Sequence, residues 1–158
     1  MSDVPARNPG DADGPEDVTS SGRPAGDVYD WYVRGHKLLT DGNAAAAVQL
    51  LRRAVEADPG SHSARETLAR ALFDARLYGE ALEVFATVVE QNPADDYAQF
   101  GLGLAALRSG DHARAVQHLS LAAAMRPDQL HYKTALRAAR VRLEADGGVA
   151  GEDETDGA

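Results

Sequence analysis

The chain of 158 residues contains no cysteine. This absence excludes disulfide bonds, thiol catalysis and the structural zinc sites that depend on cysteine ligands. Aromatic residues make up only 6% of the sequence, although hydrophobic residues reach 44% and alanine is common. This composition favours closely packed helices over a β-sandwich, which needs alternating β-branched and aromatic residues.

Long apolar stretches are also absent. No segment approaches the roughly 18 consecutive apolar residues of a membrane-spanning helix, and residues 1–27 contain no apolar run typical of a signal peptide. We therefore expect a cytoplasmic protein that does not associate with a membrane. The heavy use of Ala, Arg, Gly and Asp is typical of a GC-rich bacterial genome.

The charge is distributed unevenly along the chain. The formal net charge is −9, but residues 1–27 carry six acidic and two basic residues, and residues 146–158 carry five acidic and none that is basic. Residues 28–145 are neutral. Neither end can bury enough apolar surface to offset chain entropy, so we expect two disordered acidic tails. Such tails either keep a protein soluble or fold back onto a basic surface.

The part between the tails repeats with a period of 34 residues. Pro59, Pro93 and Pro127 are each separated by 34 positions. At the same period, residues of similar size fall into four further columns: Gly35, Ala69 and Gly103; Ala47, Ala81 and Ala115; Leu51, Phe85 and Leu119; Ala54, Val88 and Ala122. Several columns with one shared period indicate an internal structural repeat.

Each period predicts a pair of helices. Apolar residues recur three or four positions apart on both sides of a turn, as in helices with one buried face. The turns contain Gly42, Gly79 and Gly110, and Asn43 and Asp111 are suited to cap the helix that follows. Each proline separates two periods, where its missing N–H is tolerated.

This pattern resembles the tetratricopeptide repeat over residues 28–129. The family favours Trp, Leu, Gly, Tyr, Ala, Phe, Ala and Pro at eight signature positions. The chain matches them at these residues: Trp31, Gly35, Ala47, Ala54 and Pro59; Leu68, Ala81, Phe85 and Pro93; Leu102, Gly103, Ala115, Ala122 and Pro127. The resemblance implies an all-α solenoid of antiparallel helix pairs. Its repeats would span 28–61, 62–95 and 96–129, followed by a capping helix at 130–145, about seven helices in all.

The chain departs from the family pattern at a few positions. Arg34 stands at a leucine position of the first repeat, and Arg65 and Gln99 stand where Trp31 would recur. We expect these departures to weaken single contacts without changing the fold. Trp31 itself is expected in the core, because it occupies the packing column.

Two glycines lie inside predicted helices. A glycine there costs roughly 1 kcal/mol relative to alanine. Gly35 and Gly103 are therefore expected where the missing Cβ allows a second helix to approach closely. The alanine column is expected to serve the same contact, so that stacked pairs bury a continuous core.

Residues 130–145 begin a fourth period that is not completed. Lys133, Arg137 and Arg140 occupy the face that would receive another repeat. This predicts a capping helix with a polar outer face. The alternative is a small cationic site for an acidic partner or for the C-terminal tail.

The first predicted helix is apolar on two faces. Trp31 and Gly35 share one face, and Tyr29, Val33 and His36 lie opposite. A helix packed on one side only should be polar on the other.

The tetratricopeptide family suggests an explanation, because its first helices line a concave groove that binds peptides or helices. The corresponding groove residues here are Tyr29, Tyr32, Val33, His36, Arg70, Phe73, Tyr97, Phe100 and Leu104. Aromatic residues with arginine are typical of binding hot spots. The alternative is that these residues pack on one another or against the capping helix.

One specialised form of this groove is excluded by its residue types. Tetratricopeptide co-chaperones hold the C-terminal carboxylate of Hsp70 or Hsp90 with Lys, Asn and Arg side chains. The matching positions here are Tyr32, His36, Thr67, Tyr97 and Gly101. None of them fits, so we do not expect a carboxylate-clamp binder of Hsp70 or Hsp90.

Signatures of catalysis and of cofactor binding are absent. The histidines at 36, 62, 112, 118 and 131 show no HExxH or similar spacing, so we expect no metal ligands among them. The Asp95–Asp96 pair is typical of a helix N-terminus. No phosphate-binding loop and no basic stripe occur, which argues against a cofactor, an enzyme and nucleic-acid binding.

These observations predict a non-catalytic adaptor that binds another protein, as a peptide or helix, in the concave groove. One alternative is a small chaperone for a secretion or assembly partner. Another is a scaffold that self-associates through its first helix, for example as a homodimer.

Overall fold

The computed structural model describes the backbone of residues 25–156 and the side chains of residues 27–148. This part of the chain contains seven helices and no strand. They are α2 (Ala25–Thr40), α3 (Ala44–Ala57), α4 (His62–Asp74), α5 (Tyr78–Gln91), α6 (Asp96–Arg108), α7 (His112–Met125) and α8 (Leu130–Asp156). The expected all-α solenoid of antiparallel helix pairs is confirmed.

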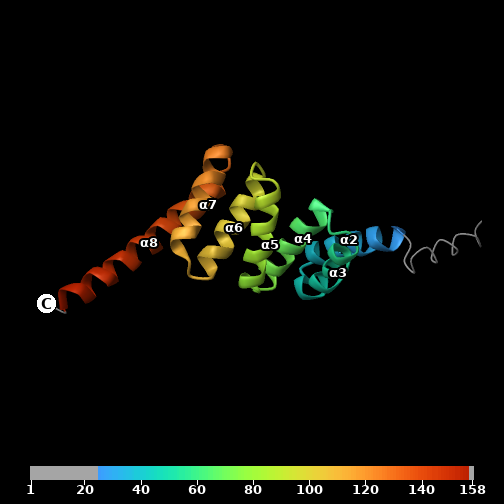
Figure 1. Cartoon of the computed structure of the whole chain (residues 1–158), viewed down its shortest axis with the longest axis horizontal. Coiled ribbons are helices and arrows are strands. Elements are labelled where there is room, and N and C mark those ends of the chain that lie inside the picture. Colours follow the sequence, from blue (N-terminus) through green and yellow to red (C-terminus); the bar gives the residue numbers. More distant parts are fainter. Residues whose placement is uncertain (1–24, 157–158) are drawn as a thin grey trace, which may run out of the picture.

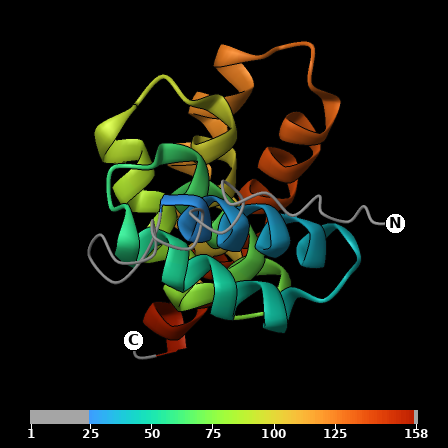
Figure 2. The same ribbon diagram turned by 90° about the vertical axis from the view of Figure 1, so that its right-hand side faces the viewer.

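The helices form a row in chain order (Figure 1). Each helix packs against the next, and the first helices of neighbouring repeats, α2, α4, α6 and α8, also contact one another. Viewed along the row, the pairs lie one behind another (Figure 2). Within residues 25–156, no helix is both long and apolar enough to cross a membrane.

The last helix is longer than the sequence indicates. We expected a capping helix over 130–145 and a disordered tail from 146, but α8 continues to Asp156 and projects beyond the body of the molecule (Figure 1). At the predicted boundary, His112 of α7 hydrogen-bonds to Asp146 over 2.6 Å, which gives this acidic segment a partner. Residues 1–24 of the predicted N-terminal tail lie outside the described residues.

The outer face of α8 is charged, as predicted for a capping helix. Lys133, Arg137 and Arg140 are all exposed, whereas Tyr132, Leu136 and Ala139 on the opposite face are buried against the third repeat. The helix is therefore apolar toward the preceding pair and polar outward.

The turn inside each repeat has one backbone geometry. The N–H groups of Asn43, Leu77 and Asp111 donate to carbonyls five residues earlier, over 2.8–2.9 Å. This is the Schellman motif, which needs a residue with positive φ at the end of the helix. Gly42 and Gly110 supply it, with φ of 88° and 90°.

The second repeat differs from the prediction. Arg76, not Gly79, adopts the positive φ of 66°, and Gly79 lies inside α5. Arg76 occupies the same column as Gly42 and Gly110, so the position in the helix pair sets the conformation. A left-handed backbone is strained for a residue with a Cβ.

The turns between repeats also share one geometry. In the first, the N–H of Ser61 donates to the carbonyl of Asp58 over 3.1 Å, and Pro59 stands at the second position of this turn. Equivalent bonds of 3.0–3.1 Å close the turns that contain Pro93 and Pro127. Proline fits this position because its fixed φ matches the turn.

The predicted columns form the core. The alanines at 47, 81 and 115 are fully buried. The residues of the next column, Leu51, Phe85 and Leu119, are at most 2% exposed. A Cβ added at Gly35 would lie 2.7 Å from Cγ of Leu51, and one at Gly103 would lie 2.6 Å from Cγ of Leu119. Both glycines thus permit the close helix contact that the sequence predicts.

In the tryptophan column, Trp31 behaves differently from the two residues that replace it in the later repeats. Trp31 is half-buried, not part of the core, and the guanidinium of Arg53 lies 5.5 Å from its ring centre. Arg65 donates to the carbonyl of Pro59, and Gln99 donates to that of Pro93 over 3.1 Å. The departures from tryptophan therefore tie the start of each helix to the preceding proline turn.

Two glycine substitutions separate close packing from helix propensity. We expect Gly103→Ala to lower the free energy of unfolding by about 1–3 kcal/mol, because the new methyl group would overlap Leu119. Gly79→Ala, whose Cβ would meet no atom within 4 Å, should instead raise it by up to about 1 kcal/mol. Urea unfolding of both variants measures the difference. Equal effects would show that the close approach at Gly103 does not exist.

Arg76→Gly should stabilise the protein by about 0.5–1 kcal/mol, because glycine adopts the left-handed turn without strain. Arg76→Ala is the matched control, since it removes the same charge but keeps the Cβ, and should change stability by a few tenths of that amount at most. Thermal unfolding at one pH compares the two. A stabilisation by alanine equal to that by glycine would assign the effect to charge.

Candidate functional site

The predicted groove residues lie along α2, α4 and α6, beside three hollows. The end hollow, of about 600 Å³, lies at the amino-terminal end of α2. The middle hollow, of about 200 Å³, is lined by His36, Glu66, Thr67, Arg70 and Tyr97. The inner hollow, of about 150 Å³, is lined by Arg70, Phe73, Asp74, Phe85, Tyr97, Phe100, Gly101 and Leu104. Eight of the nine groove residues line one of these hollows.

Val33 is the exception. It lines none of the three hollows, but its side chain is 43% exposed on α2. Tyr29 is more exposed still, at 69%. The second apolar face that the sequence predicts for this helix is thus present at the surface.

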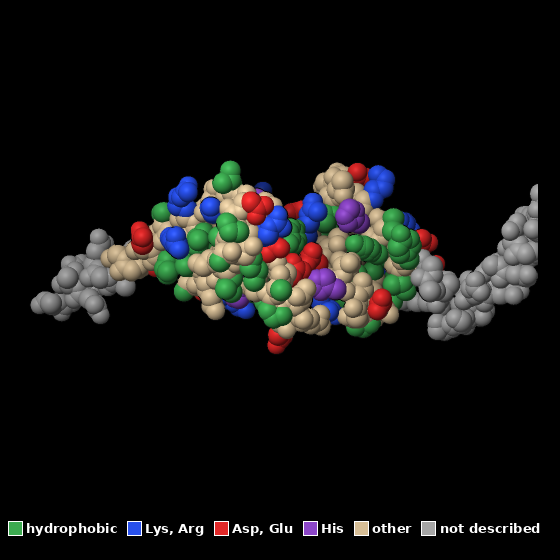
Figure 3. Space-filling view, turned by 90° about the horizontal axis from the view of Figure 1, so that it is seen from above, with side chains coloured by type: hydrophobic (Ala, Val, Ile, Leu, Met, Phe, Trp, Pro, Cys, Tyr) green, Lys and Arg blue, Asp and Glu red, His purple; other side chains and the backbone are tan. Residues whose placement is uncertain are grey.

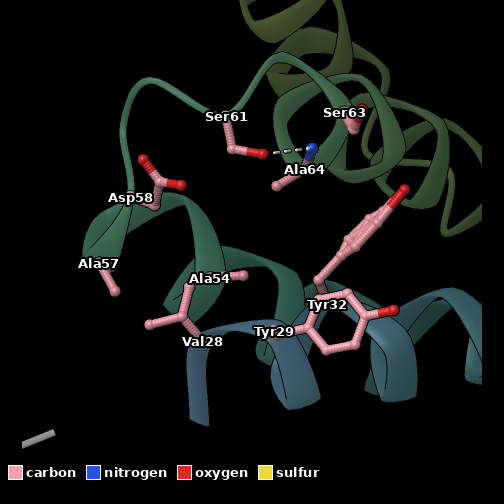
Figure 4. Close-up of a pocket in the computed structure, with 9 residues that line it drawn as sticks. All are labelled: Val28, Tyr29, Tyr32, Ala54, Ala57, Asp58, Ser61, Ser63 and Ala64. Atoms are coloured by element: carbon pink, nitrogen blue, oxygen red, sulfur yellow. Dashed lines mark hydrogen bonds between the residues drawn. The ribbon is translucent and has the colours of Figure 1, made fainter. Parts of the chain in front are cut away.

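The end hollow lies between α2, the end of α3 and the start of α4 (Figure 4). Tyr29 and Tyr32 border it from α2, and small residues, among them Ala54, Ala57 and Ala64, line the rest. The hydroxyl of Ser61 is already engaged, because it accepts a hydrogen bond from the N–H of Ala64 over 3.2 Å. The hollow therefore presents aromatic and apolar surface, with Asp58 and Ser63 as further polar residues in its lining.

Arg70 and Tyr97 connect the middle and inner hollows, because both residues line both of them. The ring of Tyr97 meets that of Phe85 edge-on, with centres 6.4 Å apart. Burial raises the pKa of the Tyr97 phenol, so its hydroxyl stays protonated at neutral pH. Arg70 is exposed, so its guanidinium offers donors beside this apolar wall.

The far side of the inner hollow is held by an aromatic and arginine cluster. Phe73 meets Tyr78 edge-on, with ring centres 5.1 Å apart. The guanidinium of Arg108 lies 5.7 Å from the Phe73 ring centre and donates to the Tyr78 hydroxyl over 3.1 Å. These contacts fix Phe73 as part of the wall.

Phe100 is partly covered by the capping helix. Its ring stacks on Tyr132 at 4.5 Å between centres and meets His131 edge-on at 5.2 Å. The alternative that groove residues pack against the capping helix therefore applies to Phe100, which still lines the inner hollow.

The junctions between successive first helices are equivalent in backbone position but differ in side chains. At the first junction, Val28, Tyr32 and Ser61 border the end hollow. At the last, the Tyr132 hydroxyl donates to Asp96 over 2.6 Å, and Tyr132 covers Phe100. The first junction is thus open and the last is closed by the capping helix.

The second junction contains His62, Glu66 and Asp95. Nε2 of His62 lies 3.0 Å from Oδ2 of Asp95 and 3.5 Å from Oε2 of Glu66. Asp95 caps α6, as predicted, since its Oδ1 accepts from the N–H of Ala98 over 3.0 Å. This cluster is not apparent from the sequence, because Asp95 lies 33 residues from His62. The four-residue spacing of His62 and Glu66 was the available signal.

The two carboxyl groups of this junction share a confined space. Burial, together with the neighbouring Asp95 carboxylate, raises the pKa of Glu66 to about 8. The pKa of Asp95 is lowered, because hydrogen bonds from Glu66, from the Ala98 N–H and from His62 favour its charged form and outweigh burial. Glu66 therefore holds a proton near neutral pH, while Asp95 is ionised.

Charged side chains of both signs alternate with hydrophobic ones on the face drawn in Figure 3. No large area of one sign stands out on it. This mixed surface agrees with the neutral charge of residues 28–145.

The raised pKa of Glu66 predicts a pH dependence. Its pKa is about 8 in the folded protein against a usual 4.5, so the folded state holds a proton that the unfolded state loses. Stability from this group therefore falls as the pH rises from 4.5 to about 8. The lowered pKa of Asp95 acts only below its usual 3.8, outside this window.

In Glu66→Gln, the fall in folding stability between pH 4.5 and about 8 that Glu66 causes should disappear. Urea unfolding with EDTA present, at about pH 5 and about pH 8, should show a larger fall in stability for the wild type than for the variant. Groups common to both proteins cancel in this comparison. Equal falls would show that Glu66 titrates at its ordinary pKa.

Comparison with protein families gives a match to the tetratricopeptide repeat model over residues 66–129. A comparison with curated protein sequences gave no match.

Solved structures extend the likeness over most of the chain. MamA from Desulfovibrio magneticus RS-1 is 26% identical, with a TM-score of 0.71, over 82% of this chain and 72% of that one. The first tetratricopeptide domain of human RPAP3 is 17% identical, with a TM-score of 0.70, over 77% of this chain and 95% of that one. The first domain of Spaghetti (RPAP3), solved with the HSP90 peptide SRMEEVD, is 18% identical with a TM-score of 0.70, over 76% and 95%.

The 34-residue period, the three helix pairs with their shared turns and these likenesses lead to one assignment. Residues 66–129 belong to the tetratricopeptide repeat family, and the fold of residues 25–156 is that of three tetratricopeptide repeats followed by a C-terminal capping helix.

Proposed function

We propose that this protein is a non-catalytic adaptor that binds a peptide or short helix of another protein along α2, α4 and α6. Tetratricopeptide repeat proteins are generally interaction modules without catalytic activity, and the fold supports a role in protein–protein interaction. The likeness to the RPAP3 domains concerns the fold alone, so the proposal rests on the side chains of this chain.

One observation carries the proposal: the middle and inner hollows adjoin and share Arg70 and Tyr97. The inner hollow has an apolar aromatic wall and a volume of about 150 Å³, similar to protein cavities that accept a benzene ring. The exposed guanidinium at its edge attracts a carboxylate. An apolar anchor beside a charged hydrogen-bonding group is the usual composition of a hot spot.

The partner segment that fits this surface has one leucine-sized or aromatic side chain near an acidic one. The apolar side chain would enter the inner hollow, and its acidic neighbour would pair with Arg70. A terminal carboxylate held in the Hsp70 or Hsp90 manner is not part of this proposal, because Tyr32, His36 and Thr67 cannot replace the lysine and asparagine of that clamp.

Self-association is a second candidate, favoured by the exposed Tyr29 and Val33 on α2. These residues lie at the open end of the row, where no preceding helix of residues 25–156 covers them. A molecular mass that rises with concentration and falls in a Tyr29→Ser/Val33→Ser variant would support it. No feature of the described residues favours the chaperone alternative over an adaptor.

The adaptor proposal predicts that Arg70→Ala/Tyr97→Ala loses binding. Peptides are first selected on the wild type from a random phage-displayed library. They should bind the double variant at least about 30-fold more weakly, because removal of a typical hot spot weakens binding by about that factor. Fluorescence anisotropy with the selected peptides measures the affinities. Circular dichroism must first show equal helicity for all variants.

The matched control is Arg137→Ala/Leu121→Ala, which removes an exposed arginine and an exposed apolar side chain from α8 and α7. It should bind the selected peptides as the wild type does. Unchanged binding by the groove variant, or equal losses in both variants, would place the binding surface elsewhere.

A further inference from the structure

The junction of the second and third repeats brings three metal-ligating side chains together. His62 begins α4, Glu66 follows one turn later on the same face, and Asp95 precedes α6 in the next repeat. One ligand atom from each residue lies within 4.8 Å of the other two. The set joins two repeats, so only the tertiary structure assembles it.

The arrangement leaves one buried acceptor without a hydrogen bond. Oε2 of Glu66 is buried and accepts no hydrogen bond, although Nε2 of His62 lies 3.5 Å away. A buried carboxylate oxygen in this state is costly unless a proton or a cation satisfies it.

The orientation of Asp95 is already fixed by the fold. Its Oδ1 accepts from the N–H of Ala98, which directs Oδ2 toward Nε2 of His62 at 3.0 Å. A ligand held by a second hydrogen bond needs less ordering when a metal binds. The cap of α6 therefore also orients a potential metal ligand.

The separations suit a small tetrahedral ion. Ligand atoms at zinc bond lengths of 2.0–2.2 Å lie about 3.3–3.5 Å from one another. The two distances from Nε2 of His62, 3.0 and 3.5 Å, lie close to this range. One imidazole with two carboxylates favours Zn²⁺ over Ca²⁺ and Mg²⁺, which prefer oxygen ligands in larger number.

We propose that His62, Glu66 and Asp95 form a binding site for Zn²⁺, with a fourth position left for water or another ligand. The divalent cation balances the two carboxylates and connects α4 to the start of α6. This site is particular to one junction. The equivalent residues are Val28, Tyr32 and Ser61 at the first junction, and Asp96, Phe100 and Gln129 at the last. It does not depend on the proposed adaptor function.

Calorimetric titration of tag-free, EDTA-treated and dialysed protein with ZnCl₂ tests the site. We expect one equivalent bound with micromolar affinity or better, a higher melting temperature with Zn²⁺, and no competition from Mg²⁺ or Ca²⁺. Glu66→Gln should weaken binding at least about 10-fold. Asp95→Asn keeps an oxygen that can cap α6, and it should also weaken Zn²⁺ binding at least about 10-fold.

The control is His112→Ala, which disrupts another histidine–aspartate pair, His112 with Asp146 at 2.6 Å. It should bind Zn²⁺ as the wild type does. Absence of binding in the wild type, equal affinity in Glu66→Gln, or a loss in His112→Ala would each overturn the proposal. Visible absorption of the Co²⁺ complex gives a second readout, since tetrahedral coordination gives stronger bands than hexahydrated Co²⁺.

Discussion

The close contact between the two helices of each repeat sets the geometry of the whole molecule. In the first and third repeats, a glycine on the first helix lies directly against a leucine on the second, at Gly35 with Leu51 and Gly103 with Leu119. The missing Cβ lets the two backbones approach, and the fully buried alanine column fills the remaining space. Each pair then packs against the next, and the pairs together form the row.

The second repeat modifies this contact and thereby links to the third. It has Ala69 and Phe85 in place of glycine and leucine, and the ring of Phe85 lies over Gly101 of α6. A Cβ at position 101 would overlap this ring, so only glycine fits there without a shift of Phe85. The same ring meets Tyr97, so a core residue of one repeat also shapes the wall of the inner hollow in the next.

Backbone geometry is constant along the repeats, whereas the side chains at the junctions are not. The turns within the repeats share one hydrogen-bond pattern even where Arg76 replaces glycine. The junctions of the first helices hold an open aromatic hollow, a histidine and carboxylate cluster, and an aromatic stack under α8, in that order. A repeated scaffold thus offers three chemically different positions.

Much of the fold is encoded in local pattern, and the sequence alone was sufficient to identify it. The period of the prolines, the buried columns and the glycines at 42 and 110 depend on helix spacing and turn chemistry, which act over a few residues. The extension of α8 past residue 145 was not predicted, and the contact of Asp146 with His112 at its start is not local. The positive φ at Arg76 was not predicted, because residues with a Cβ rarely adopt it, and Gly79, expected in the turn, lies inside α5.

The candidate sites depend on the tertiary structure to different degrees. The positions of the groove residues follow from the repeat, but only packing shows that Phe100 lies under Tyr132 and that Arg70 and Tyr97 join two hollows. The contact of His62 and Glu66 with Asp95 could not be read from the chain, since it depends on how one repeat stacks on the next. The sequence determined the repeat and its core, because helical spacing and a 34-residue period of similar residues can both be seen along the chain. The tertiary structure decided which polar groups meet, because that requires residues about 30 positions apart to converge.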